Sequence, residues 1–342
     1  MATPALRQAR DRLPGTFIGA LARPGINEVL EGSNLVDEIH VERAEGMMGP
    51  KRVAASIRPR RYDTALLLTN SFSTALITRI AGVARRIGYA RDGRSLLLTD
   101  RLAGPKLDSG DWAPVPAVAY YLRAVRAMLG DTLADVNDWC ATRASDEAST
   151  AVLELAISPA QQQRATEILT RVGVTPDAPL ALLNPGGNNP AKRWPAEYFI
   201  ELAKALSARH GLRCLINGSP GETNLVRDIA TASHAVPLVD AGVTIGSLKG
   251  IVARSRIMVT NDTGPRHIAA ALGVPTVSIF GPTDPHWTII HAPAGEVILT
   301  PPPATDADEN ATDAPPITRI STTAVLDACG RLLTRGGVTA MR

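Results

Sequence analysis

The feature that most constrains this fold is an alternation of short apolar runs with helical stretches. Strands that alternate with helices favour parallel sheets covered by helices on both faces. The first half predicts strands over 16–22, 36–41, 64–69 and 86–89, and helices over 26–31, 51–60, 73–82 and 114–129. The second half predicts helices over 160–172, 196–209, 222–232, 247–253 and 265–272, and strands over 180–183, 212–217, 257–260 and 276–280.

The two series of elements predict two α/β domains. The chain has 342 residues, about twice a typical domain. Residues 131–149 are acidic and polar with few apolar anchors, which is typical of a linker. We therefore expect a domain over 1–145, a second over 150–320 and a terminal helix over 321–342. Ligands of open α/β sheets bind at the carboxyl ends of the strands, so we expect a site in a cleft between the domains.

Composition excludes several classes of protein. Hydrophobic residues make up 45% and charged residues 20%, which is typical of a soluble globular protein and excludes a disordered chain. No apolar run reaches the ~18–20 residues of a membrane span, and residues 1–13 do not resemble a signal peptide. The three cysteines lack disulfide or zinc spacing, which favours a reducing compartment and predicts a cytoplasmic protein.

Positive charge is concentrated in one segment. Residues 51–106 contain twelve Lys and Arg against three Asp, a net +9 in a chain whose total is +3. This imbalance indicates an anionic partner, or simply a solvated arginine-rich surface. No nucleic-acid motif accompanies the charge, and we expect no nucleic acid as a partner.

The strongest motif spans residues 258–267, M-V-T-N-D-T-G-P-R-H. A strand runs into Asp262-Thr263-Gly264, and a helix is predicted to begin near Pro265. Asp262 or Thr263 would cap that helix, whose N–H groups and dipole form an anion site. Gly264 lacks the Cβ that would obstruct a phosphate. The alternative is an ordinary strand-to-helix turn.

A second motif spans residues 182–194, L-L-N-P-G-G-N-N-P-A-K-R-W. Gly186 and Gly187 permit close backbone approach, and Lys192 follows before the next helix. The spacing fits neither the P-loop nor GxGxxG. A loop followed by a cation is suited to holding a diphosphate, although a surface lysine on a turn has the same pattern.

Other chemistry lacks support in the sequence. The six histidines show no metal-binding spacing, and no GxSxG elbow is present. Asp306-Ala307-Asp308 has the letters of a metal-binding D-x-D motif but lies in a proline-rich stretch without a preceding strand. We therefore expect neither a metal nor a cofactor. His267 is interpreted either as a structural histidine or as a donor to a bound phosphate.

With both motifs in view, the sequence resembles the ADP-heptose:lipopolysaccharide heptosyltransferases, glycosyltransferase family 9, and especially their heptosyltransferase II branch. The resemblance covers nearly the whole chain. Its carriers are N-S-F-S-T-A-L (70–76), R-R-I-G-Y-A-R-D-G-R (85–94), N-P-G-G with A-K-R-W-P (184–195) and N-D-T-G-P-R-H-I-A-A-A-L-G-V-P-T-V-S-I-F-G-P-T-D-P (261–285).

The resemblance implies a GT-B fold, in which two Rossmann-like domains face each other, with ADP-heptose on the C-terminal domain. It implies that Lys192 neutralises the donor diphosphate and that Glu222 contacts sugar or ribose hydroxyls. The remaining donor-binding residues that it implies are Gly186, Gly187, Asn188, Asp262, Thr263, Gly264 and His267. The implied acceptor is the inner core of lipopolysaccharide, which would meet the basic N-terminal domain at the cytoplasmic face of the inner membrane.

The implied reaction is an inverting, metal-independent transfer of heptose. Lys192 and the helix N–H groups would stabilise the charge on the leaving diphosphate, and a general base would activate the acceptor hydroxyl. In the family this base is an aspartate in a Gly-Asp loop after the first strand of the N-terminal domain. Relatives carry that strand and loop before the stretch matching residues 1–7, so we expect the base upstream of Met1. Without the strand, ladder groups in the middle of the N-terminal sheet would be unpaired.

Two alternatives remain open. One is a family member that uses another nucleotide sugar. The other is a non-catalytic sugar-nucleotide-binding remnant that has lost the base. A nicotinamide-dependent dehydrogenase is disfavoured because neither half shows GxGxxG after its first strand.

Overall fold

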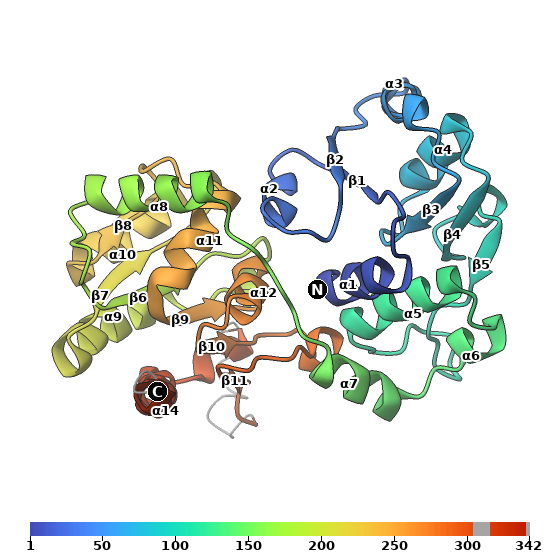
Figure 1. The fold of residues 1–342 in the computed structure, drawn as a ribbon. Helices are drawn as coiled ribbons and strands as arrows, with labels where there is room; N and C mark the ends of the chain where they lie inside the picture. The colour runs from blue at the N-terminus through green and yellow to red at the C-terminus, as the bar shows by residue number, and fades with distance from the viewer. Residues whose placement is uncertain (304–314, 340–342) are drawn as a thin grey trace. The chain divides into compact units, whose positions relative to one another are not determined.

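The computed structural model describes residues 1–303 and 315–339. The described residues form two compact units, which we treat separately. Residues 1–152 and 286–291 form the N-terminal unit, and residues 153–285 together with the part of the chain from 292 onward form the C-terminal unit. Each unit is a parallel α/β assembly, which confirms the predicted fold class (Figure 1).

The C-terminal unit is built on a six-stranded parallel sheet of order β11-β10-β9-β6-β7-β8. Its strands are β6 (Leu180–Asn184), β7 (Arg213–Ile216), β8 (Val236–Pro237), β9 (Ser255–Asn261), β10 (Thr276–Ile279) and β11 (Glu296–Leu299). Its helices are α8 (Pro159–Arg171), α9 (Ala196–His210), α10 (Thr223–Ser233), α11 (Ile245–Arg254), α12 (Gly264–Ala271) and α14 (Thr322–Thr339). Short 3₁₀ turns are η3 (Pro190–Lys192), η4 (Pro220–Glu222) and η6 (Pro316–Arg319).

Both faces of this sheet are covered, because its central strand is apolar on both sides. Residues 180–183 of β6 are all 0% exposed. Ala181 and Leu183 pack with α9, α10 and α14, whereas Leu180 and Leu182 pack with α8, α11 and α12. This period-2 alternation in a continuously apolar strand is typical of a parallel sheet between two helical layers.

The N-terminal unit contains two separate parallel sheets. One pairs β1 (Gly19–Ala22) with β2 (Glu38–Val41), and the other has the order β3-β4-β5, formed by β3 (Thr64–Leu67), β4 (Arg85–Tyr89) and β5 (Asp100–Leu102). Among the described residues, β1 forms a ladder only with β2, and β3 only with β4. In the part of the chain that the structure describes, these two sheets are separate (Figure 1).

Helices of the N-terminal unit surround the two sheets. They are α1 (Thr3–Arg12), α2 (Asn27–Leu30), α3 (Gly49–Ile57), α4 (Phe72–Ala81), α5 (Ala117–Leu129), α6 (Leu133–Asn137) and α7 (Ala141–Thr150), with 3₁₀ turns η1 (Arg58–Arg60), η2 (Ser95–Leu97) and η5 (Pro285–Thr288) near them. Ala5 and Ala9 of α1 pack against Val125 of α5. Residues 286–291 return to this unit from the second half of the chain.

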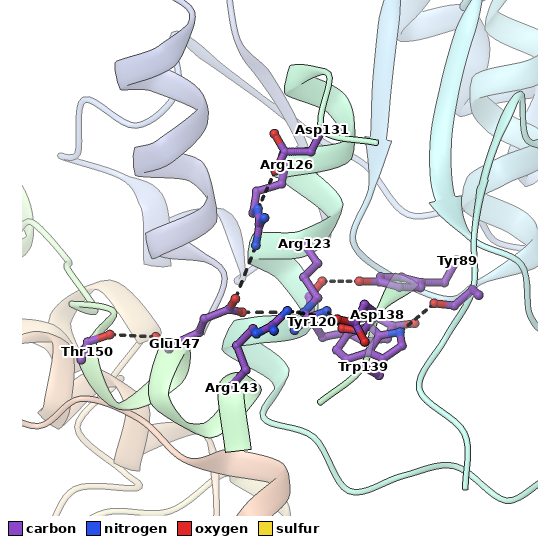
Figure 2. Close-up of polar contacts among 11 residues, drawn as sticks. Tyr89, Tyr120, Arg123, Arg126, Asp131, Asp138, Trp139, Arg143, Glu147 and Thr150 are labelled. Atoms are coloured by element: carbon purple, nitrogen blue, oxygen red, sulfur yellow. Dashed lines mark hydrogen bonds and ion pairs between the residues drawn. The ribbon is translucent and has the colours of Figure 1, made fainter. Parts of the chain in front are cut away.

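The segment predicted as a linker is instead helical. Residues 131–149 contain α6 and most of α7, so the prediction of a linker there was wrong. Figure 2 shows the polar network that holds α7 against α5: the Glu147 carboxylate lies 3.7 Å from Nε of Arg123 and 3.4 Å from Nη1 of Arg126. Ion pairs between two helices therefore add to the burial of Val136, Ala144 and Ala148, the few apolar residues of this segment that pack inside.

Candidate functional site

The candidate site lies where the order of the C-terminal sheet reverses. β6 lies between β7 and β9, so the chain builds the sheet outward in both directions from the β6–β9 pair. Loops that follow two such strands meet at the shared carboxyl edge of the sheet, where α/β proteins bind ligands. The two sequence motifs follow β6 and β9, and the structure brings them together.

Lys192 and Asp262 join the two motifs. Lys192 ends the 3₁₀ turn η3, and its Nζ lies 2.9 Å from Oδ2 of Asp262, which follows β9. The Asp262 side chain is 6% exposed and that of Lys192 27%. An ammonium has three N–H donors, and within the described part of the chain Nζ donates only to Asp262. The ammonium is therefore oriented by one partner and keeps donors for another.

The N-terminus of α12 has no side-chain cap. Thr263 is the N-cap residue in an extended conformation, without a capping hydrogen bond. The expectation that Asp262 or Thr263 caps this helix was wrong: Asp262 pairs with Lys192, and the Thr263 hydroxyl accepts a hydrogen bond from Nδ2 of Asn184 at 3.2 Å. A Cβ at Gly264 would meet no protein atom within 4 Å. The positive end of α12 thus borders open space. His267 lies on the first turn of the same helix.

Gly186 and Gly187 approach Glu222 closely. A Cβ on Gly186 would lie 2.3 Å from Oε1 of Glu222, so a larger residue there would displace the Glu222 carboxylate. The Gly187 N–H donates to Oε1 of Glu222 at 2.7 Å, while the Ser219 N–H and hydroxyl donate to Oε2. Burial raises the pKa of Glu222, but these hydrogen bonds outweigh it and lower the pKa below its ordinary value. Glu222 therefore fixes the loop after β6 to the loop after β7. Asn188 lies next in the loop and is exposed.

Three asparagines that sequence reasoning missed organise the same edge. Asn217 Nδ2 donates to Asn184 Oδ1 at 2.7 Å, and Asn184 Nδ2 in turn donates to Thr263. Asn261 Nδ2 donates to the carbonyls of Pro185 and Gly186 at 2.7 and 3.2 Å. Each asparagine ends or follows an apolar strand, and that position was the signal available in the sequence. Together they hold the loops that carry Lys192 and Asp262.

A cavity of about 330 Å³ adjoins the Gly187 loop. It is lined by Arg193 and residues 220–225, and Nε of Arg193 donates to the Gly187 carbonyl at 2.7 Å. Its volume falls within the range of roughly 300–1,000 Å³ typical of small-molecule sites. The site thus combines an oriented cation, an open helix N-terminus and a cavity at one edge of one sheet.

Two arginines of the basic segment, residues 51–106, are buried inside the N-terminal unit. Arg86 and Arg94 are 9% and 0% exposed. Arg86 donates to the carbonyls of Val83, Ala84 and Leu97, and Arg94 donates to the Tyr89 carbonyl. These two guanidinium groups satisfy loop carbonyls, so the charge that faces solvent is smaller than the +9 counted from the sequence.

Comparison with known proteins shows the family of the chain. Residues 51–305 match the sequence profile of glycosyltransferase family 9 (heptosyltransferase). The chain belongs to this family. Its similarity to lipopolysaccharide heptosyltransferase 2 of Salmonella typhimurium is 28% identity over 244 residues, 70% of this chain and 65% of the relative. Lipooligosaccharide heptosyltransferase 2 of Haemophilus ducreyi is 30% identical over 251 residues, 71% of this chain and 67% of the relative. The match therefore spans about two thirds of the length of these relatives.

Two solved structures share the fold of this family 9 chain. A glycosyl transferase family 9 protein from Veillonella parvula has a TM-score of 0.79 at 23% identity, covering 98% of this chain and 93% of its own. The ADP-heptose lipopolysaccharide heptosyltransferase II of E. coli has a TM-score of 0.75 at 23% identity, covering 98% and 95%. These matches confirm the predicted GT-B fold class.

Two further features considered in the sequence are a metal site and a membrane-spanning helix. The residues of the described ranges include no group of three or more His, Cys, Asp or Glu side chains that could hold a metal ion. The Asp306-Ala307-Asp308 sequence lies outside the described residues. Within the same ranges, no helix combines the length and apolarity needed to cross a bilayer.

Proposed function

We propose that this chain binds ADP-heptose on its C-terminal unit and transfers heptose to the inner core of lipopolysaccharide. The observation that carries the proposal is the Lys192–Asp262 pair beside the uncapped N-terminus of α12. An ammonium and oriented backbone N–H groups at one point are suited to a diphosphate. Family membership supports the sugar-transfer class.

In the proposed complex, Lys192 and the first turn of α12, with Thr263 and Gly264, contact the diphosphate. Gly186, Gly187 and Asn188 form the adjoining loop, and His267 lines the same pocket. The cavity beside Glu222 takes the nucleoside, whose hydroxyls would use the remaining lone pairs of the Glu222 carboxylate. Asp262 acts as a positioning residue, because its buried carboxylate orients the Lys192 ammonium.

The proposed chemistry is an inverting displacement without a metal. Negative charge grows on the diphosphate as the bond to the anomeric carbon breaks, and Lys192 with the α12 N–H groups stabilises it. The acceptor hydroxyl attacks from the opposite face and gives its proton to a general base. We assign no residue of the chain to that base. The acceptor would meet the N-terminal unit at the cytoplasmic surface of the inner membrane.

A binding-only function is the second candidate, and the divided N-terminal sheet favours it. Among the described residues, β1 and β3 each have a ladder partner on one side, so a base on the loops after them would be held less firmly. The 342-residue chain would then bind the donor but transfer little sugar. A transfer assay with ADP-heptose and a lipopolysaccharide inner-core acceptor separates the two candidates, since robust turnover would exclude the binding-only function.

Calorimetric titration with ADP tests the donor site. Lys192→Ala should weaken ADP binding by about tenfold or more, because a charge-assisted hydrogen bond contributes about 1.5–3 kcal/mol. Lys204→Ala is the matched control: Lys204 is an exposed lysine on α9, outside the site, and its removal should leave the affinity unchanged.

A further variant separates binding from folding. Lys192→Ala leaves the buried Asp262 carboxylate unpaired, which would destabilise the loop. The double variant Lys192→Ala/Asp262→Asn removes that carboxylate charge as well. If the double variant binds ADP as tightly as the unchanged chain, Lys192 does not contact the diphosphate and the proposal fails.

A further inference from the structure

The turn that precedes α3 holds two methionines in solvent. Met47 is 97% exposed and Met48 61%, and in the described part of the chain Met47 is the most exposed large apolar side chain. The turn itself is tightly folded. The Gly49 N–H donates to the Gly46 carbonyl at 3.1 Å, and a Cβ on Gly49 would lie 2.6 Å from the backbone of Ala44. The exposure of the two methionines is therefore fixed by the backbone.

α3 continues this apolar tip with a basic face. Met48, Lys51, Ala55 and Arg58 follow one another at spacings of three and four residues, which places them on one side of the helix, and all four are exposed. The opposite side of α3 is buried against α4 (Figure 1). The helix thus lies along the surface of the N-terminal unit with its cations turned outward.

The positive charge of this region is uncompensated. Residues 46–62 contain five Lys and Arg and no Asp or Glu. Arg60 pairs with Glu38 at 2.6 Å, and none of the other four cations forms an ion pair within residues 1–303 and 315–339. Lys51 and Arg52 lie in the first turn of α3, where the helix dipole disfavours cations, and the N-cap Met48 supplies no capping hydrogen bond. Such a choice of residues weakens the helix, which indicates that they serve an intermolecular contact.

We propose that this surface docks the chain on an anionic lipid bilayer. The surface, called the α3 surface below, consists of Met47, Met48, Lys51, Arg52 and Arg58. The methionines enter the boundary between headgroups and acyl chains, and the cations meet the lipid phosphates. Charge complementarity and the projecting apolar tip favour a bilayer. A protein partner would need a shaped surface of roughly 800 Å² on each side.

Docking on a bilayer does not rest on the proposed function. Its purpose does, because it would hold the donor site near an acceptor that is carried by lipid. The docking itself depends only on the exposed methionines and the unpaired cations of α3.

Co-sedimentation of the full chain with lipid vesicles tests the role of charge. The chain should bind vesicles of phosphatidylcholine mixed with phosphatidylglycerol about tenfold or more tightly than vesicles of phosphatidylcholine alone, and high salt should release it. Each cation near the surface contributes about fivefold, so Lys51→Gln/Arg52→Gln should weaken binding roughly twentyfold. Lys204→Gln/Arg209→Gln is the matched control, since it removes two exposed cations from α9 and should leave binding unchanged.

The same assay tests insertion of the methionines. Met47→Ser/Met48→Ser keeps the charge of the α3 surface and should weaken binding to the anionic vesicles by about tenfold, because apolar side chains no longer leave water. Leu96→Ser is the matched control, since Leu96 is 87% exposed in the same unit but outside the α3 surface. It should bind as the unchanged chain does.

Several outcomes would overturn the proposal. These are equal binding to both kinds of vesicle, no binding to either, or a loss in the control variants as large as in the α3 variants. Unchanged binding of Met47→Ser/Met48→Ser would refute insertion. Displacement of the chain by free glycerol 3-phosphate would show that the surface recognises a single phosphate instead of a bilayer.

ADP titrated into the same samples separates docking from the proposed function. Lys192→Ala should lose ADP and keep the vesicles, and Lys51→Gln/Arg52→Gln should do the reverse. Failure of ADP binding alone would refute the proposed function and leave the α3 surface standing. Failure of vesicle binding alone would do the opposite.

Discussion

The two units are built from the same alternation of strands and helices, yet their sheets differ in completeness. β6, at the centre of the C-terminal sheet, has ladder partners on both sides and residues 180–183 are 0% exposed. In the N-terminal unit, β1 has one ladder partner among the residues that the structure describes, and Leu21 on that strand is 39% exposed. Val41 on β2 is 44% exposed. The same periodicity forms strands in both units, but β6 is hydrogen-bonded along both edges, whereas β1 is hydrogen-bonded along one among the described residues.

Because of this difference in strand pairing, the loops and cavities of the two units are held in place in different ways. The candidate donor site stands on strands that are paired on both sides, so its loops have fixed ends. A cavity of the N-terminal unit lies at the carboxyl ends of β3 and β4, and it is ordered by stacked aromatic side chains such as Tyr120 on Tyr89. Each of the following predictions tests this comparison, and they run from the largest expected effect to the smallest.

Native-state hydrogen exchange should separate the two sheets most strongly. Amides of β6 and β9 should exchange only through global unfolding, while those of β1 and β2 open locally. A difference of about 4 kcal/mol in opening free energy corresponds to a rate ratio of about 10³. Hydrogen–deuterium exchange read by mass spectrometry on peptides from both sheets measures this ratio. Similar protection of the two sheets would show that the division has no energetic consequence.

Loss of a buried arginine should cost more in the C-terminal unit. Arg266 is 0% exposed and pairs with both Glu296 oxygens, at 2.6 and 2.9 Å. Arg266→Met leaves a buried carboxylate, and we expect about 3–5 kcal/mol of destabilisation. Arg123→Met in the N-terminal unit should cost less, because Nε and Nη2 of Arg123 already lack hydrogen-bond partners among the described residues. Urea unfolding measures the loss of unfolding free energy in each variant. If Arg123→Met costs as much as Arg266→Met or more, the comparison of the two units is wrong.

Gly186→Ala tests the brace at the donor site. The new Cβ would meet the Glu222 carboxylate at 2.3 Å, so that side chain must move and lose its hydrogen bonds to Gly187 and Ser219, at about 1–3 kcal/mol. ADP affinity and stability should both fall, as measured by calorimetry and urea unfolding. Gly330→Ala on α14 is the control, because it lies outside the site and a Cβ there would come no closer than 4.0 Å to another residue. Equal effects of the two substitutions would mean that the close approach to Glu222 is unimportant.

The smallest expected effect is the pH dependence contributed by Glu222. Its pKa is lower in the folded protein than in the unfolded chain, so its stabilisation is present above the unfolded pKa of about 4.3 and is lost as pH falls through the folded value. Glu222→Gln should therefore flatten the loss of thermal stability between neutral pH and pH 3. The melting temperature of both proteins over this range measures it, and parallel curves would exclude the contribution.

The sequence predicted most elements of both sheets but missed others. β5 and α6 lack the apolar periodicity on which the prediction depended, and α7 buries the small side chains of Ala144 and Ala148 beside the ion pairs of Glu147 with Arg123 and Arg126. In the candidate site, Lys192, Asp262 and the glycines were named from the sequence. The clamping role of Asn184 and Asn261 was not, since asparagine at the end of a strand also occurs in ordinary turns.

By itself, the sequence determined the α/β class, the family and the two loops that follow apolar strands, because these depend on local periodicity and on motifs read along the chain. Only the tertiary structure decided that Lys192 pairs with Asp262 seventy residues away, that Gly186 makes room for Glu222, and that Trp287 returns to the N-terminal unit. The physical reason is that such contacts follow from strand order and packing, which bring distant segments together and leave no signal in local periodicity.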